Sequence, residues 1–190
     1  MYINNLFKYY GICKTYLDQM KGRLSRLEDL INGLLAYARV GRTIQTQEAV
    51  DVRQLLTEVA DLVVPPDFTL RIGPDMPSFE TDRLSLQQVF TNLLSNAVKY
   101  HHRGAGLLAV NSRDLGDFYE FRVRDDGPGI ASEYHQKIFL LFQTLRDRHT
   151  AESTGIGLSI VQKIINEQQG TIRVESAVGQ GAGFIFTWPK

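Results

Sequence analysis

The residues with the clearest chemical potential are two carboxamides and a lysine in the stretch 92–100. Asn92 and Asn96 lie four residues apart, so a helix in this stretch would project both side chains from one face. A carboxamide oxygen is a neutral ligand for a hard cation such as Mg²⁺. Lys99 lies on the next turn, where its ammonium group could reach a phosphate. Taken alone, these residues would also fit the solvent-facing side of an amphipathic helix.

Two glycine-rich turns follow along the chain. Asp125 precedes the first, Gly127-Pro128-Gly129, and its carboxylate could accept a hydrogen bond from an amino group such as that of adenine. Gly155 and Gly157 form the second turn, before an apolar helix whose free N-terminal amides would favour a phosphate. Either turn alone could be a loop without a ligand. In this order, the three stretches together predict an ATP site with groups for metal, base and phosphates.

These residues need a scaffold, and from residue 50 the pattern indicates a mixed α/β structure. Asp51 is suited to cap a first helix, and Pro65-Pro66 to end it. The polar stretch 145–154 has no apolar period and is predicted to be a mobile loop. We predict helices over 52–63, 82–100, 133–142 and 155–168, and strands over 68–72, 107–111, 118–124, 171–176 and 183–188.

The N-terminal part carries a different pattern, with apolar residues at alternating spacings of three and four. This spacing is the a/d seam of a coiled coil or helix bundle. A helix cannot bury such a seam alone, so a partner helix is predicted; the alternative is that the seam folds back onto the following domain. We expect a helical segment at 1–42, ended near Gly41, a linker at 43–49 and one domain at 50–190. The seam consists of Leu17, Met20, Leu24, Leu27, Ile31, Leu34 and Ala38.

Composition limits the function classes. The chain has 190 residues, with 21 Lys+Arg and 21 Asp+Glu, and this balance argues against a nucleic-acid partner. The single cysteine, Cys13, excludes an intramolecular disulfide and suits a reducing compartment. No apolar run approaches the ~20 residues that span a bilayer. We therefore expect a cytoplasmic segment without membrane contact, while a longer parent protein could be membrane-attached.

The ordered motifs resemble the catalytic ATP-binding domain of bacterial sensor histidine kinases, in the superfamily shared with gyrase and Hsp90. In that family they are similar to the N box (92–100), G1 box (125–129), F box (138–142), ATP lid (145–154) and G2 box (155–158). The resemblance implies an α+β fold, a two-layer α/β sandwich preceded by a long coiled-coil-type helix. It also implies ATP and Mg²⁺ as cofactors.

The same resemblance implies roles for single residues. Asn92 and Lys99 would be the catalytic candidates, Asn96 the Mg²⁺ ligand and Asp125 the acceptor for the adenine amino group. The loop cations Arg146 and Arg148 would reach the phosphates, although a solvated loop would carry such residues equally well. The other implied ATP-binding positions are Tyr100, Gly127, Gly129, Ile130, Phe142, Thr154, Gly155, Ile156, Gly157 and Leu158.

The N-terminal helix resembles the second helix of the dimerisation and phosphotransfer hairpin, and its residues 34–42 look closest to phytochrome-like kinases. This implies a homodimer through the helix. It also implies a response regulator receiver domain as a partner of the parent protein.

Asn92 helps to choose the reaction. The ATPases of the superfamily place a glutamate at this position as a base for the hydrolytic water, whereas a carboxamide cannot take a proton at neutral pH. Transfer to a protein nucleophile is therefore favoured over hydrolysis. A hydrolytic ATPase of the same superfamily and a nucleotide-binding but catalytically silent module are the alternatives.

Three features depart from the family pattern. The histidines are His101, His102, His135 and His149, and none lies on the heptad helix, so the phosphoacceptor is expected outside these residues. We interpret His101 and His102 as polar surface residues. Ser153 stands where the G2 box usually has its first glycine. Asp126 replaces a common asparagine, a change that we expect to leave ligand binding intact.

Overall fold

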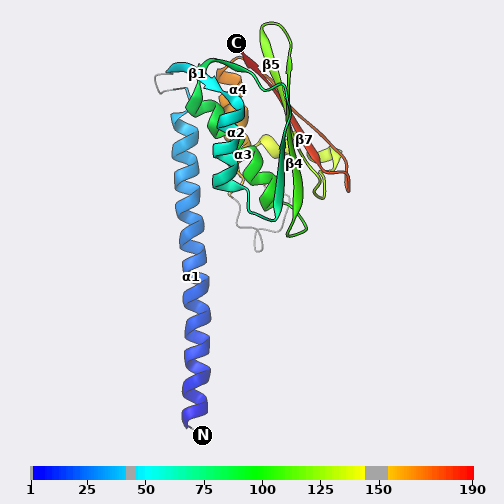
Figure 1. The fold of residues 1–190 in the computed structure, drawn as a ribbon. Helices are drawn as coiled ribbons and strands as arrows, with labels where there is room; N and C mark the ends of the chain where they lie inside the picture. Colours follow the sequence, from blue (N-terminus) through cyan, green and yellow to red (C-terminus); the bar gives the residue numbers. More distant parts are fainter. Residues whose placement is uncertain (1, 42–45, 144–153) are drawn as a thin grey trace.

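One long helix, α1 (Tyr2–Arg39), projects away from the rest of the molecule (Figure 1). The computed structural model describes residues 2–41, 46–143 and 154–190, with side chains from Lys14 onward. The predicted seam faces solvent along this helix, and Leu17, Met20 and Leu24 are 57%, 66% and 67% exposed. Within the described part of the chain, no helix is long and apolar enough to cross a membrane.

A second stripe on α1, offset from the seam, holds its C-terminal turns against the rest of the protein. Leu30, Ala36, Tyr37 and Val40 pack against the hydrophobic core. The helix then ends at Gly41, which has a positive φ of 79°. The seam therefore does not fold back onto the domain, which was the alternative considered from the sequence.

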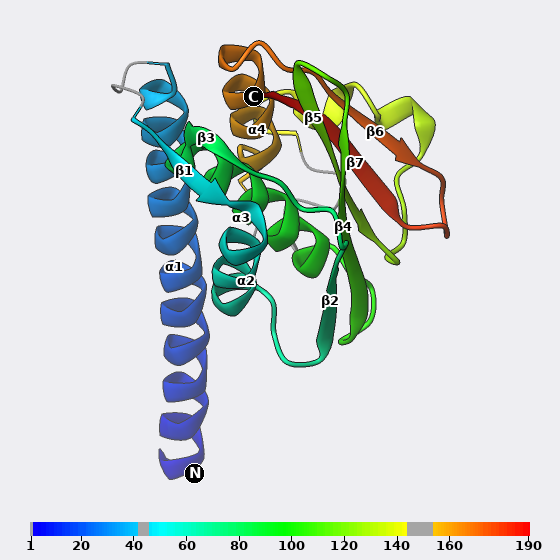
Figure 2. The ribbon, with the colours of Figure 1, turned by 45° about the horizontal axis from the view of Figure 1, so that its top comes forward.

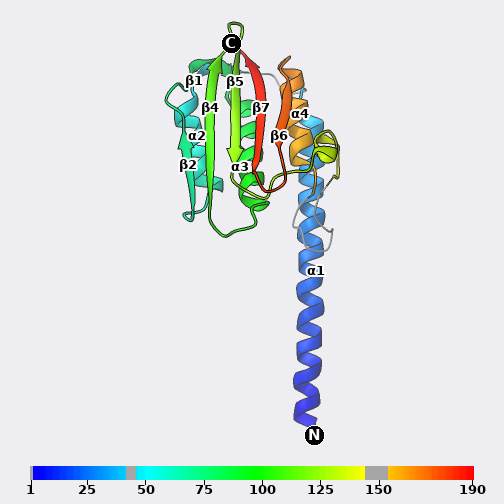
Figure 3. The same cartoon turned by 90° about the vertical axis from the view of Figure 1, so that its right-hand side faces the viewer.

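A five-stranded sheet forms one layer of the remaining structure, with strand order β2-β4-β5-β7-β6 (Figure 3). Its strands are β2 (Phe68–Ile72), β4 (Gly106–Asp114), β5 (Phe118–Asp125), β6 (Ile172–Ser176) and β7 (Ala182–Pro189). The β2–β4 pair is parallel and the other pairs are antiparallel. All five strands were predicted; the bounds of β2 agree with the prediction, and those of the other strands differ by at most three residues at an end.

Three helices form the second layer, on one face of the sheet: α2 (Val52–Val63), α3 (Arg83–Lys99) and α4 (Gly157–Glu167). Figure 2 shows them between α1 and the sheet, with α3 packed against both α2 and α4. Asp51 caps α2 by accepting hydrogen bonds from two backbone amides, as predicted, and Asp82 caps α3 in the same way. The two-layer α/β sandwich with a preceding long helix is confirmed.

Two sequence-based predictions were wrong in detail. The stretch 133–142 contains two 3₁₀ turns, Ser132–Tyr134 and Lys137–Phe139, rather than one helix, because its backbone bonds span three residues and Phe142 has a positive φ of 65°. A two-stranded sheet of β1 (Gln47–Asp51) and β3 (Ser78–Asp82) was not predicted. Strand β1 begins inside the predicted linker 43–49, and the division of the chain into domains remains a prediction.

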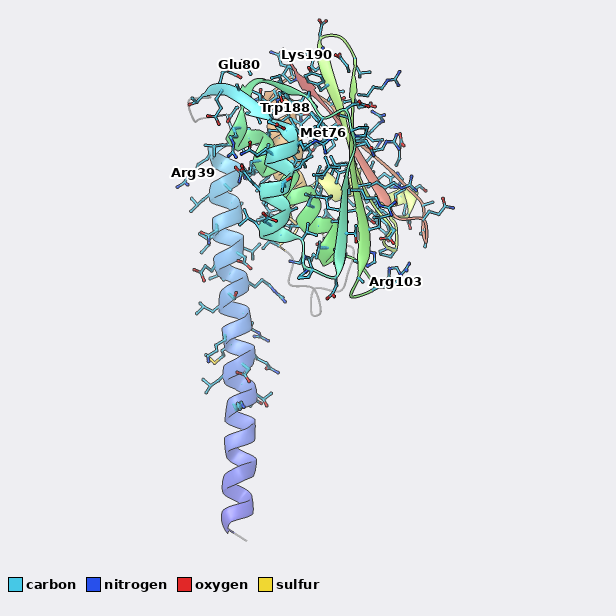
Figure 4. The ribbon with its side chains drawn as sticks, viewed as in Figure 1. Arg39, Met76, Glu80, Arg103, Trp188 and Lys190 are labelled. Atoms are coloured by element: carbon cyan, nitrogen blue, oxygen red, sulfur yellow. The ribbon has the colours of Figure 1, made fainter. Side chains whose placement is uncertain are left out.

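Trp188 on β7 joins the small sheet to the large one (Figure 4). Its ring is fully buried, and its indole nitrogen donates a hydrogen bond of 2.7 Å to the hydroxyl of Thr81 on β3. A buried Trp N–H requires such an acceptor, so this bond offsets the cost of burying the N–H group. Arg103 marks the opposite end of the sheet in Figure 4. The predicted site residues gather at that opposite end, where β5 ends and β7 begins.

Candidate functional site

A cavity of about 290 Å³ brings the three predicted stretches together. It lies between the C-terminal half of α3, the turn after β5, the second 3₁₀ turn, the start of α4 and the start of β7. The predicted site residues that line it are Asn96, Tyr100, Asp125, Gly129, Ile130 and Leu158. The other lining residues were not among the predicted ATP-binding positions, although Pro128 and Ile138 belong to the G1 and F boxes; they are Ala97, Pro128, Ile138, Gln143, Ala182 and Phe184.

Asp125 is the acidic group of this cavity. Its Oδ1 accepts hydrogen bonds from the amides of Gly127 at 2.8 Å and Ala182 at 3.2 Å, which fix the orientation of the carboxylate. Burial raises the pKa of Asp125 above its ordinary value, and the two amides oppose this effect. The cavity thus holds a partly desolvated carboxylate in a fixed orientation, which suits a directed hydrogen bond to an amino group.

The G1 turn, residues 125–130, packs tightly against the turn that joins β6 to β7. Gly129 has φ of 72°, and a Cβ there would lie 2.0 Å from the carbonyl oxygen of Ala177. Gly181 has φ of 74°, and its Cβ would lie 2.1 Å from the carbonyl oxygen of Asp125. Both positions therefore require glycine for conformation and for space. The contact between the two turns fixes the base of the cavity.

Helix α3 presents Asn92 and Asn96 to the start of α4. The side-chain amide of Asn92 donates to the carbonyl of Gln88 at 2.8 Å, one turn earlier. A Cβ at Gly157 would lie 2.8 Å from Asn92 Oδ1 and 3.8 Å from Asn96 Nδ2. The lack of a side chain at Gly157 thus lets the start of α4 pack close to both carboxamides.

The remaining predicted site residues that the structure describes do not line the cavity. Lys99 is exposed at the end of α3 and does not line the cavity, and neither do Thr154 and Phe142. Gly155 has φ of 67°, and its carbonyl accepts a hydrogen bond from the Phe142 amide at 3.0 Å. Helix α4 begins at Gly157, two residues later than predicted. Arg146, Arg148 and Ser153 lie outside the described residues.

The prediction that His101 is a polar surface residue was wrong. Its side chain is fully buried, and its Nε2 lies 3.1 Å from Oδ1 of Asp126. The same carboxylate oxygen accepts a 2.7 Å hydrogen bond from the Leu107 amide. This amide, with a smaller contribution from His101, lowers the pKa of Asp126. His102, in contrast, is exposed as expected.

Comparison with known proteins gives a consistent set of matches. Residues 81–190 match the family model described as histidine kinase-, DNA gyrase B-, and HSP90-like ATPase. The phytochrome-like protein Cph1 of Synechocystis is 31% identical over 180 residues, which are 93% of this chain and 24% of that protein. The chain therefore spans about a quarter of the length of this curated relative.

Two solved structures extend the likeness beyond the family domain. Full-length ShkA in complex with AMPPNP has a TM-score of 0.75 and 29% identity over 93% of this chain and 38% of its own. The histidine kinase ThkA, in complex with the response regulator protein TrrA, has a TM-score of 0.70 and 29% identity over 92% of this chain and 50% of its own. Because both matches cover more than nine tenths of this chain, they include part of α1 as well as the sandwich.

Proposed function

Because the chain belongs to the histidine kinase-, DNA gyrase B- and HSP90-like ATPase family and matches the ATP-binding catalytic part of sensor histidine kinases, we propose that its cavity binds Mg·ATP for transfer of the γ-phosphoryl group to a histidine outside this chain. The observation that carries the proposal is the cavity itself. Asn96 and Asp125 line the same space, and the glycine start of α4 lies against the Asn92–Asn96 face of α3.

The adenine end of the site is assigned to Asp125. Its carboxylate is held by two amides and lies among Ile130, Ile138 and Phe184, which provide apolar surface for a flat base. A hydrogen bond from the adenine amino group to this carboxylate would be shielded from water. It would distinguish adenine from a base with a carbonyl group at the same position.

The phosphate end is assigned to Asn96, Lys99 and the first amides of α4. The described residues contain no cluster of three or more His, Cys, Asp or Glu that could hold a metal ion by themselves. A single carboxamide oxygen from Asn96 fits Mg²⁺, which commonly keeps several waters and binds substrate phosphates. When bound, Mg²⁺ would neutralise phosphate charge, while the α4 amides and Lys99 would orient the terminal phosphate.

The proposed reaction is phosphoryl transfer rather than hydrolysis. The bond between the γ-phosphorus and the bridging oxygen breaks, a phosphorus–nitrogen bond forms on the acceptor imidazole, the imidazole proton is released, and ADP leaves. Asn92 supports this choice because its amide donates to Gln88 and a carboxamide cannot remove a proton from water. An exchange of Asn92 for glutamate would supply such a base.

The direct test is titration of the whole chain with a fluorescent ATP analogue, with and without Mg²⁺. We expect saturable binding that Mg²⁺ strengthens, and transfer of labelled phosphate to an added fragment that carries a histidine helix, as an acid-labile product. Binding without any transfer would favour the catalytically silent module. Steady release of inorganic phosphate without an acceptor would favour the hydrolytic ATPase.

Two partners belong to the proposal. The exposed seam of α1 supports a homodimer, because burial of each large aliphatic side chain contributes about 1.5–3 kcal/mol. We expect the double variant Leu24→Glu and Ile31→Glu to sediment as a monomer at a concentration where the unaltered chain dimerises; equal monomeric sedimentation would contradict the dimer. The second partner is a response regulator receiver domain, supported by the complex of ThkA with TrrA.

A further inference from the structure

A second carboxylate, Asp126, ties the turn that carries Asp125 to two other parts of the chain. Its Oδ1 accepts a hydrogen bond from the Leu107 amide at 2.7 Å and lies 3.1 Å from Nε2 of His101. Leu107 is in the first part of β4, and His101 follows the C-terminal end of α3. One side chain therefore connects β4, the end of α3 and the G1 turn.

Both ring nitrogens of His101 have polar partners. Nδ1 lies 3.0 Å from the carbonyl oxygen of Arg103 and 3.2 Å from its amide nitrogen. Because a carboxylate can only accept a hydrogen bond, Nε2 donates to Asp126. Every buried side-chain nitrogen or oxygen in the described residues has a partner, and both ring nitrogens of His101 conform to this rule.

The ring of His101 is also enclosed by its packing. It meets the ring of Phe68 edge-on, with 5.2 Å between the centroids and an interplanar angle of 82°. A Cβ at Gly106 would lie 2.8 Å from His101 Nε2, and a Cβ at Gly127 would lie 3.3 Å from His101 Cδ2. The imidazole thus packs beside Gly127, whose amide donates a hydrogen bond to the carboxylate of Asp125.

We propose that His101 and Asp126 are positioning residues, which hold the G1 turn so that Asp125 presents its carboxylate to the adenine amino group. The inference rests on the proposed ATP site. Asp125 receives its orientation from the amides of Gly127 and Ala182, and the His101–Asp126 hydrogen bond fixes the segment that contains Gly127. Without this hydrogen bond, residues 125–127 can reorient, and the directed bond to the base weakens more than contacts to the phosphates.

This role predicts a change in base selectivity, which a merely structural role would not cause. Inosine triphosphate carries a carbonyl where ATP carries its amino group, so an oriented Asp125 binds ATP and repels the analogue. We expect His101→Ala and Asp126→Ala to lower the ratio of ATP affinity to inosine triphosphate affinity about three- to tenfold, the loss expected for one net hydrogen bond. The double variant should lose no more than either single variant, because both remove the same bond.

Two matched variants serve as controls. Asp126→Asn keeps an oxygen that accepts from both the Leu107 amide and His101 Nε2, so selectivity should stay within about twofold of the unaltered chain. His102→Ala removes the neighbouring imidazole, which is exposed and stacks on His101 with 5.2 Å between the centroids, and should leave the ratio unchanged.

The measurement is competition of each triphosphate against a fluorescent ATP analogue, with circular dichroism and thermal unfolding of every variant. Asp126→Ala removes a side chain that is 45% exposed, so this variant is expected to fold. It therefore tests the positioning role even if His101→Ala fails to fold. An unchanged ratio in folded Asp126→Ala overturns the positioning role, as does an unaltered chain that binds both triphosphates equally. If the unaltered chain binds neither, the proposed ATP site itself is refuted.

Discussion

The two ends of the cavity are built in different ways. At the proposed adenine end, the carboxylates of Asp125 and Asp126 accept hydrogen bonds from three backbone amides, those of Leu107, Gly127 and Ala182. The turn that carries both carboxylates packs closely against the β6–β7 turn. At the proposed phosphate end, α3 and α4 approach each other closely at Gly157, and α4 also packs against α1. The first end is therefore built from turns of the sheet, whereas the second depends on the packing of three helices.

Helix α1 reaches the phosphate end through a specific set of contacts. A Cβ at Gly33 would lie 3.0 Å from Cδ1 of Ile156, the residue between the two glycines of the G2 box. Lys163 on α4 donates a 2.8 Å hydrogen bond to the carbonyl of Tyr37 and lies 4.5 Å from the centre of its ring. Movement of α1 is therefore expected to disturb the phosphate end more than the adenine end.

The largest expected effect tests how rigid the adenine end is. Gly129→Ala combines a positive φ with a Cβ 2.0 Å from the carbonyl oxygen of Ala177, so the two turns must separate. We expect a loss of about 3 kcal/mol or more in the free energy of unfolding, measured by urea denaturation. Gly179→Ala is the matched control, because its φ is 80° but its Cβ would meet open space. Its expected cost is about 1 kcal/mol. An equal cost for both variants would show that the close contact between the two turns contributes little to stability.

The next effect concerns recognition at the same end. Asp125→Ala removes the proposed partner of the adenine amino group, and we expect a loss of about 1–3 kcal/mol in ATP binding. Titration with a fluorescent ATP analogue measures it. Asp61→Ala, at an exposed position on α2, should bind like the unaltered chain. Unchanged affinity in folded Asp125→Ala would remove the adenine assignment.

The sequence predicted the elements whose signals are local. Asp51 at the N-cap and Pro65-Pro66 after the C-terminus gave α2 its bounds, and the glycine turns marked Asp125 as the base-binding candidate. Strands β1 and β3 had no such signal, because β1 buries only Val50 and shows no alternation. His101 was misjudged because its burial depends on Phe68 and Asp126, which the fold brings to it from distant parts of the sequence.

A smaller effect tests the link between α1 and the phosphate end. Gly33→Leu places a side chain against Ile156, whereas Gly22→Leu on the same helix meets nothing within 4 Å. Both exchanges favour the helix intrinsically by up to about 1 kcal/mol, so only the first should weaken docking. We expect faster amide hydrogen exchange at the start of α4 in Gly33→Leu alone. Equal exchange in the two variants would show that α1 does not support the phosphate end.

The smallest expected effect is a difference in how the stability contributions of the two neighbouring carboxylates depend on pH. Burial raises the pKa of Asp125, so its folded form binds a proton more readily than the unfolded chain does. Its contribution to stability is present below the ordinary aspartate pKa of 3.8 and is lost as pH rises through the raised value. The Leu107 amide lowers the pKa of Asp126, so its contribution is present above 3.8 and is lost as pH falls through the lowered value.

Replacement of each residue by asparagine should therefore change the pH dependence in opposite directions. Relative to the unaltered chain, Asp125→Asn should lower the free energy of unfolding less at neutral pH than at low pH. The reason is that the carboxyl group it removes stabilises the fold only when protonated. Asp126→Asn should cost most at neutral pH, where the ionised carboxylate accepts from the Leu107 amide, and least in acid. Urea midpoints of the three chains between pH 3 and pH 7 measure both trends. Parallel curves for the two variants would mean that burial at Asp125 and the amide contact at Asp126 do not set these two pKa values, and that the adenine end is less dry and less rigid than its geometry indicates.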